Sequence, residues 1–174
     1  QDAWRFPSYF SETSLVDDTT VSSLACANRV ISVANLDIVR NRINISSSEG
    51  PTRDGRPKPD VAAPGTDITA ARGFSDPSTP WITLSGTSMA SPAAAGCAAQ
   101  IQSVDGTLKS WPEGCRAILL AGAKRNITGQ TWWRDVVADV DASDGSGAVD
   151  ALESVNIAKQ RRSRNAAATG RGWD

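Results

Sequence analysis

The chain has 174 residues, the size of one ordinary domain. Its formal net charge of −1 provides no electrostatic footprint for nucleic acid or for an anionic membrane surface. No apolar run approaches the ~20 residues of a membrane-spanning helix. The sequence has no histidine, which excludes every mechanism or zinc site that takes a histidine from this chain.

The three cysteines, Cys26, Cys97 and Cys115, show no CxxC spacing. Without histidine they are too few for the four ligands typical of zinc, and we expect them to be small buried apolar side chains. The sequence begins with Gln1 rather than with an initiator methionine, and its first residues do not resemble a signal peptide. We therefore expect the sequence to begin at an internal boundary of a longer protein.

The strand signals come first along the chain. Residues 30–36 are rich in β-branched side chains and predict a strand. Frequent glycine and proline over 46–59 predict a loop, and 60–65 is a short apolar segment that a Pro-Gly turn closes. Residues 81–85 alternate between apolar and polar side chains and predict another strand, which ends at Gly86.

Three helices are predicted after these strands, over 88–104, 112–123 and 148–158. The first tolerates Pro92 because the proline lies near its start. It is rich in alanine, and such small side chains allow close packing, so we expect this helix at the centre of the protein. Strands followed by helices indicate an α/β domain, which we place at 1–158.

Residues 159–174 differ in composition from the rest of the chain. They contain several arginines and few apolar side chains. This composition predicts a basic polar tail that is solvated or disordered rather than a packed element.

The motif Gly86-Thr87-Ser88-Met89-Ala90 lies where a predicted strand meets a predicted helix. Gly86 permits a sharp turn because it has no Cβ, and Thr87 is a candidate N-cap. Ser88 in the first helical turn has an exposed hydroxyl and an unpaired backbone N–H, which together with the positive helix end would stabilise an oxyanion. The residues alone fit a nucleophile or an ordinary capped helix.

This motif, extended through Pro92, resembles the nucleophile motif of the subtilisin-like serine peptidases, the subtilases. Segments 30–33, 47–51, 58–65 and 145–151 also resemble that family, in the same order. Asp60 lies 28 residues before Ser88, a spacing typical of the family. The resemblance covers about residues 30–158. It implies a three-layer α/β fold with a mainly parallel sheet, of which this chain holds only the C-terminal part.

The resemblance implies roles for four consecutive residues. Ser88 would be the nucleophile that forms an acyl-enzyme during the hydrolysis of a protein or peptide substrate, and its backbone N–H would be one oxyanion donor. Thr87 would flank the oxyanion site and Met89 would pack beside the nucleophile. We place both, together with Gly86, in the substrate-binding region.

Other implications of the resemblance concern ligands and location. The reaction requires no metal or cofactor. Some subtilases bind structural calcium, but the acidic side chains here lack the EF-hand pattern and indicate a solvated loop; they are Asp135, Asp139, Asp141 and Asp144. The family tends to be secreted, and the sequence itself carries no signal for a compartment.

The catalytic aspartate, histidine and oxyanion asparagine of the family precede the strand at 30–36, and this chain has no histidine. We expect these groups on a complementary N-terminal segment outside this sequence. Residues 1–174 alone should then be inactive, because an unactivated serine hydroxyl is a poor nucleophile. They should also be unstable alone, because half of a parallel sheet exposes strand edges.

Two alternatives remain. The chain is a catalytically dead pseudo-peptidase that keeps the fold as a binding or scaffold module, although a dead site gives no reason to retain Ser88. Otherwise it is a relative of the sedolisins, which share the fold and a Gly-Thr-Ser motif but use carboxylates in place of histidine. Met89-Ala90-Ser91-Pro92 fits the subtilisins better.

Overall fold

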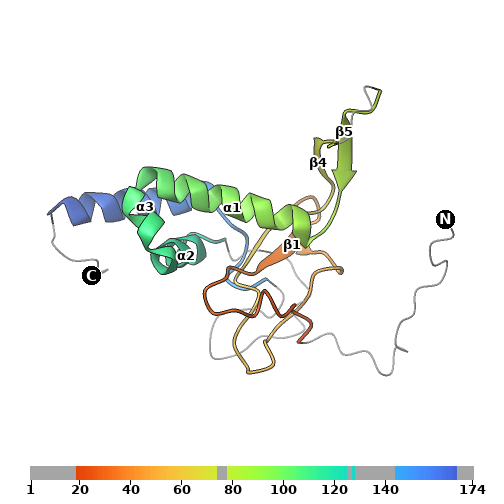
Figure 1. Ribbon diagram of the computed structural model, residues 1–174, viewed down its shortest axis with the longest axis horizontal. Coiled ribbons are helices and arrows are strands. Elements are labelled where there is room, and N and C mark those ends of the chain that lie inside the picture. The colour runs from red at the N-terminus through yellow and green to blue at the C-terminus, as the bar shows by residue number, and fades with distance from the viewer. Residues whose placement is uncertain (1–18, 74–77, 125–126, 128–143, 168–174) are drawn as a thin grey trace.

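The computed structural model describes residues 19–73, 78–124, 127 and 144–167 (Figure 1). The strands are β1 (Val33–Asp37), β2 (Arg42–Ile43), β3 (Val61–Pro64), β4 (Ile68–Ala71) and β5 (Trp81–Leu84). The helices are α1 (Thr87–Val104), the 3₁₀ helix η2 (Gly106–Ser110), α2 (Pro112–Ala121) and α3 (Ala151–Ala167). Within these residues, no helix is both long enough and apolar enough to cross a membrane.

The strands form two separate sheets. In the first, the order is β2-β1-β3; β1 pairs with β3 in parallel from Val33 opposite Val61, and with β2 antiparallel. In the second, β4 and β5 form an antiparallel hairpin with Ile68 opposite Leu84. The hairpin projects away from the helices and the first sheet (Figure 1). The only parallel pair among the described strands is therefore β1 with β3.

Helix α1 lies against β1 and β3 through small side chains. Ala90 and Ala94 are buried against Ala63, with Val33 packed beside them. Alanine at these positions lets the helix backbone approach the sheet closely. The opposite face of α1 is exposed in the described part of the chain. The helix is predicted to lie at the centre of the protein, but here other elements cover only one of its faces.

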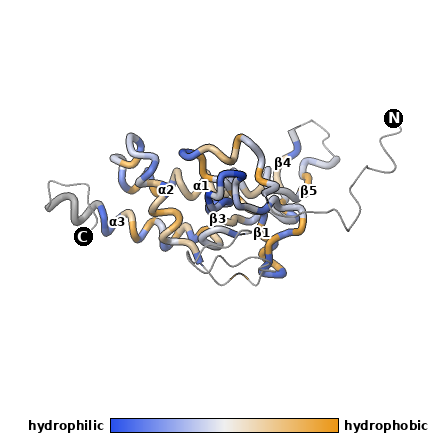
Figure 2. The backbone as a smooth tube through the Cα atoms, turned by 90° about the horizontal axis from the view of Figure 1, so that it is seen from below, coloured by the Kyte–Doolittle hydropathy of each residue, from blue (hydrophilic) through white to orange (hydrophobic). Residues whose placement is uncertain are grey.

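A second core joins the helices to one another. Ile101 of α1, Leu108 of η2, and Ile118 and Leu119 of α2 are fully buried in one cluster, which Ala158 of α3 completes. Figure 2 shows hydrophobic positions concentrated where α1, α2 and α3 run together. This cluster holds the far end of α1, away from the turn that begins it.

Most predicted elements are confirmed with small shifts at their ends. The strands predicted at 30–36 and 81–85 are β1 and β5, and the helices predicted at 88–104 and 112–123 are α1 and α2. The apolar segment at 60–65, for which the sequence predicts no strand, contains β3. The sequence does not predict β4, which is short and directly follows a Pro-Gly turn. Nor does it predict that β5 pairs with β4 in a separate hairpin rather than extending the parallel sheet.

Helix α3 begins and ends later than predicted. Ala148 is not helical because it forms bridges to Ala62 and Lys124. The helix starts after Asp150, whose carboxylate accepts the N–H of Glu153 at 3.0 Å. It continues to Ala167, past the predicted end at 158.

The prediction of a solvated tail from residue 159 is wrong at Arg161. This guanidinium is buried, forms an ion pair with the buried carboxylate of Asp105, and donates to the Thr107 hydroxyl at 3.1 Å. It also lies 5.0 Å from the centre of the Trp111 ring, a cation–π contact. The arginine therefore ties α3 to the end of α1 instead of facing water.

Asp105 is held ionised by these neighbours. Burial alone would raise the pKa of its carboxyl, but hydrogen bonds from Thr107 and the charge of Arg161 outweigh burial and hold the pKa below its ordinary value. Because the folded pKa is below the unfolded one, the resulting stabilisation is present above about pH 4 and is lost as the pH falls further.

Replacing Arg161 with leucine should leave Asp105 as an uncompensated buried carboxylate. We expect the free energy of unfolding at pH 7 to fall by about 3 kcal/mol, measured by urea unfolding of the protein that includes the complementary segment. Lys124→Met is the control, since it breaks the Lys124–Asp150 pair at an exposed lysine and should have a smaller effect. The difference between wild type and Arg161→Leu should shrink below about pH 4. Equal losses in both variants would contradict this role of Arg161.

Candidate active site

Ser88 is the second residue of α1, directly after the turn that connects β5 to the helix. Its side chain is exposed, and neither its hydroxyl nor its backbone N–H has a hydrogen-bond partner among the described residues. The first turn of α1 contains no acidic residue, so nothing there neutralises the positive end of the helix. Ser88 thus combines an available hydroxyl with an available N–H donor.

The turn before Ser88 depends on Gly86, the N-cap of α1. Gly86 has φ 151°, where a residue with a Cβ would be strained. Its carbonyl accepts the N–H of Met89 at 3.0 Å and of Ala90 at 3.3 Å, which begins the helix. Thr87 is the first helical residue and makes no capping bond, so its predicted N-cap role is wrong.

The turn is fastened to the first sheet at Gly65. The N–H of Gly86 donates to the Gly65 carbonyl at 2.7 Å, and the N–H of Gly65 donates to the Leu36 carbonyl at 3.1 Å. A Cβ on Gly65 would lie 2.5 Å from Asn35 Oδ1, 2.7 Å from the Gly86 oxygen and 2.9 Å from the Ala90 Cβ. Only glycine allows β1, β3 and the start of α1 to meet this closely.

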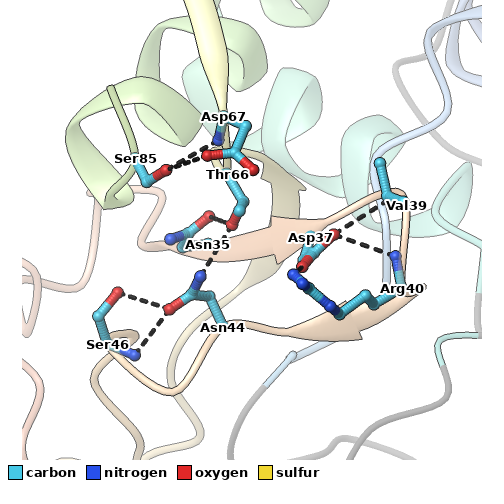
Figure 3. Close-up of polar contacts among 9 residues, drawn as sticks. All are labelled: Asn35, Asp37, Val39, Arg40, Asn44, Ser46, Thr66, Asp67 and Ser85. Carbon is cyan, nitrogen blue, oxygen red and sulfur yellow. Dashed lines mark hydrogen bonds and ion pairs between the residues drawn. The ribbon is translucent and has the colours of Figure 1, made fainter. Parts of the chain in front are cut away.

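Polar side chains surround this meeting point (Figure 3). The Asn44 amide donates to the Thr66 hydroxyl at 3.0 Å, and Thr66 donates to Asn35 Oδ1, also at 3.0 Å. On the hairpin side, the backbone N–H of Asp67 donates to the Ser85 hydroxyl at 2.8 Å. Residues 65–67 therefore contact β1, the loop after β2, and the turn before Ser88.

Asp60 lies in a different place from the nucleophile, at the entry to β3. Its buried carboxylate accepts the Ser32 N–H at 2.6 Å and the Lys58 ammonium at 2.6 Å, and it also pairs with Arg116 of α2. Lys58 is itself buried and donates to the Val30 carbonyl at 2.7 Å. With both cations in contact, Asp60 is a structural anion that joins β1, β3 and α2.

No cation site is evident in the part of the chain that the structure describes: no group of three or more carboxylate or thiol side chains is placed to hold a metal ion. Most of the acidic stretch around 135–144 lies outside the described residues, so the expectation of a solvated loop there stays a prediction.

The structure brings the four predicted site residues together in one turn, as their sequence order requires. Thr87 is exposed like Ser88, whereas Gly86 and Met89 are partly buried. Sequence reasoning missed the residues that hold this turn, namely Gly65, Asp67 and Ser85. The Pro-Gly pair at 64–65 is the signal in the sequence, but by itself it predicts only a turn that closes the apolar segment 60–65.

Comparisons with known proteins agree with this geometry. The model of the subtilase family, Peptidase_S8, matches residues 11–159, most of the chain. Serine protease AprX of Bacillus subtilis (strain 168) is 32% identical over 155 residues, covering 80% of this chain and 32% of that protein. The chain therefore belongs to the subtilase family.

Solved structures show the same α/β subtilisin-like fold. The Clostridium perfringens CspB protease aligns with a TM-score of 0.66 and 28% identity, covering 83% of this chain and 29% of that one. The prenylagaramide maturation protease PagA aligns with a TM-score of 0.59 and 23% identity, covering 80% of this chain and 46% of that one. The chain spans about a third of the length of AprX and CspB.

Replacing Gly65 with alanine tests the close approach beneath the nucleophile turn. The added Cβ must displace the Gly86 carbonyl or the Asn35 amide, so we expect a loss of about 1–3 kcal/mol in unfolding free energy. Gly106→Ala is the matched control, because a Cβ there meets nothing within 4 Å. Thermal unfolding of both variants, each with the complementary segment present, measures the effect. A Tm for Gly65→Ala equal to that of Gly106→Ala would show that the approach is not tight.

Proposed function

We propose that this chain is the nucleophile-bearing part of a serine endopeptidase. The proposal rests on one observation above all: Ser88 presents an exposed, unpartnered hydroxyl at the start of α1, within a sequence that belongs to the subtilase family. The substrate is a protein or peptide, and the relatives reported above are proteases by name.

In the proposed reaction, the Ser88 Oγ attacks the carbonyl carbon of the peptide bond while a base takes its proton. The amine leaves with a proton returned by that base, and water then hydrolyses the acyl-enzyme. The backbone N–H of Ser88 and the positive end of α1 stabilise the negative oxygen of each tetrahedral intermediate. Gly86 keeps that N–H at the open end of the helix.

The base comes from outside this sequence, because the chain has no histidine. We propose that a complementary N-terminal segment supplies the catalytic aspartate, histidine and oxyanion asparagine. Without it the chain should be inactive, since the hydroxyl of Ser88 has no partner to take its proton.

The exposed face of α1 is evidence for the complementary segment and for the place where it packs. Pro92, Ala95 and Ala99 are exposed and follow Ser88 at intervals of four, seven and eleven residues, which places all four on one helix face. Small side chains there permit another backbone to approach closely, as Ala90 and Ala94 do on the covered face. A segment that packs on this face would lie directly beside the nucleophile.

The absence of histidine also favours a second candidate, a pseudo-peptidase that serves as a binding or scaffold module. In that case the same face of α1 would bind a partner, but no base would reach Ser88. Chemical modification of Ser88 distinguishes the two functions, because only an activated serine reacts readily with a fluorophosphonate.

A fluorophosphonate probe should label the complete protein at Ser88, as located by mass spectrometry. Ser88→Ala should abolish labelling, whereas Ser91→Ala, at an exposed serine three residues further on, should not. Cys97 and Cys115 should not compete for the probe, because burial raises the pKa of both thiols. Residues 1–174 alone should remain unlabelled. A folded complete protein that is never labelled would be the scaffold protein instead.

Ala99→Trp tests whether the exposed face of α1 is covered in the complete protein. A tryptophan in a close helix contact should cost about 1–3 kcal/mol through overpacking, and so lower the Tm. Lys109→Trp is the control, at an exposed position of η2 away from that face. If the two variants of the complete protein melt at the same temperature, Ala99 faces solvent and the complementary segment packs elsewhere.

A further inference from the structure

A contact between Asp67 and Ser85 ties the base of the hairpin to the residue before the nucleophile turn. The Asp67 N–H donates to the Ser85 hydroxyl at 2.8 Å, and that hydroxyl lies 3.2 Å from Asp67 Oδ1, to which it donates (Figure 3). Each residue therefore both gives and receives one hydrogen bond. We call this two-bond contact the clasp.

The clasp takes the place of one further backbone hydrogen bond between β4 and β5. Pairing between β4 and β5 ends with Ile68 opposite Leu84. Asp67 has φ 54°, in the left-handed region, so its backbone leaves the strand direction. The Ser85 hydroxyl accepts a hydrogen bond from the Asp67 N–H, which in a regular strand pair would donate to a backbone carbonyl. One residue further on, the Gly86 N–H bonds to the Gly65 carbonyl at 2.7 Å.

We propose that Asp67 and Ser85 are positioning residues that set the placement of the Ser88 hydroxyl. This inference rests on the proposed function of Ser88. The Gly65–Gly86 bond attaches the turn to the end of β3 on the sheet side. The clasp supplies a second attachment, on the hairpin side, three residues before the nucleophile. Together the two attachments fix the orientation of the turn.

A positioning role and a stabilising role predict different effects. Both clasp residues are exposed, so their hydrogen bonds contribute little to the free energy of unfolding. Catalysis is more sensitive, because a small displacement of a nucleophile lowers the rate steeply while substrate binding is retained. Loss of the clasp should therefore lower kcat and leave KM and Tm nearly unchanged.

Ser85→Ala in the complete peptidase tests the clasp. We expect the rate of acylation to fall about tenfold with KM unchanged. Ser85→Thr keeps a hydroxyl and should restore most of the rate. Thr83→Val is the matched control: it removes the Thr69–Thr83 hydroxyl contact of 2.8 Å, which is equally exposed and lies in the same hairpin. Equal losses in Ser85→Ala and Thr83→Val, or no loss in Ser85→Ala, would overturn the proposal.

Amide hydrogen exchange tests the clasp without relying on activity. In the complete protein, a peptide spanning residues 84–90 should exchange several-fold faster in Ser85→Ala than in wild type or Thr83→Val. An unchanged exchange rate would overturn the clasp even if Ser88 is the nucleophile. Faster exchange in a protein whose wild type never reacts with a fluorophosphonate would instead uphold the clasp and refute the proposed function.

Discussion

The position of the nucleophile turn depends on the absence of a side chain at Gly65. At this α-carbon the end of β3 meets β1 and the start of α1, and a Cβ would collide with Asn35, Gly86 and Ala90. Because the space is empty, Gly65 can bond to Leu36 on one side and to Gly86 on the other. The parallel pair of β1 and β3 therefore determines where α1 begins, and with it the position of Ser88.

The far end of α1 is fixed by charge. Asp105 follows the helix directly, and its buried carboxylate holds Arg161 of α3, which also covers the Trp111 ring. A second buried carboxylate, Asp60, joins the entry of β3 to α2. Such pairs cost desolvation free energy, so they specify which elements meet more than they add stability. Helix α1 is thus attached at both ends and packed on one face. The face that carries Ser88 is left available to another segment.

The sequence predicts local structure well where one residue type decides it. Gly86 and the alanines that follow indicate a turn and a closely packed helix, and both are present. It fails where a distant partner decides. Several arginines after residue 158 are typical of a solvent-exposed segment. Arg161 is buried because of Asp105 and Trp111, which lie fifty or more residues earlier in the chain. Residues 68–71 form a strand only because β5 returns beside them.

We propose above that Ser88 is a nucleophile activated by a group from outside this sequence. A crystal structure of the complete protein after reaction with a fluorophosphonate tests this proposal. We predict a phosphonyl group on the Ser88 Oγ, the Ser88 N–H donating to a phosphonyl oxygen, and a histidine from the complementary segment within hydrogen-bond distance of that Oγ. A phosphonyl group on another residue, or a modified Ser88 with no histidine or other base within reach, would contradict the claim.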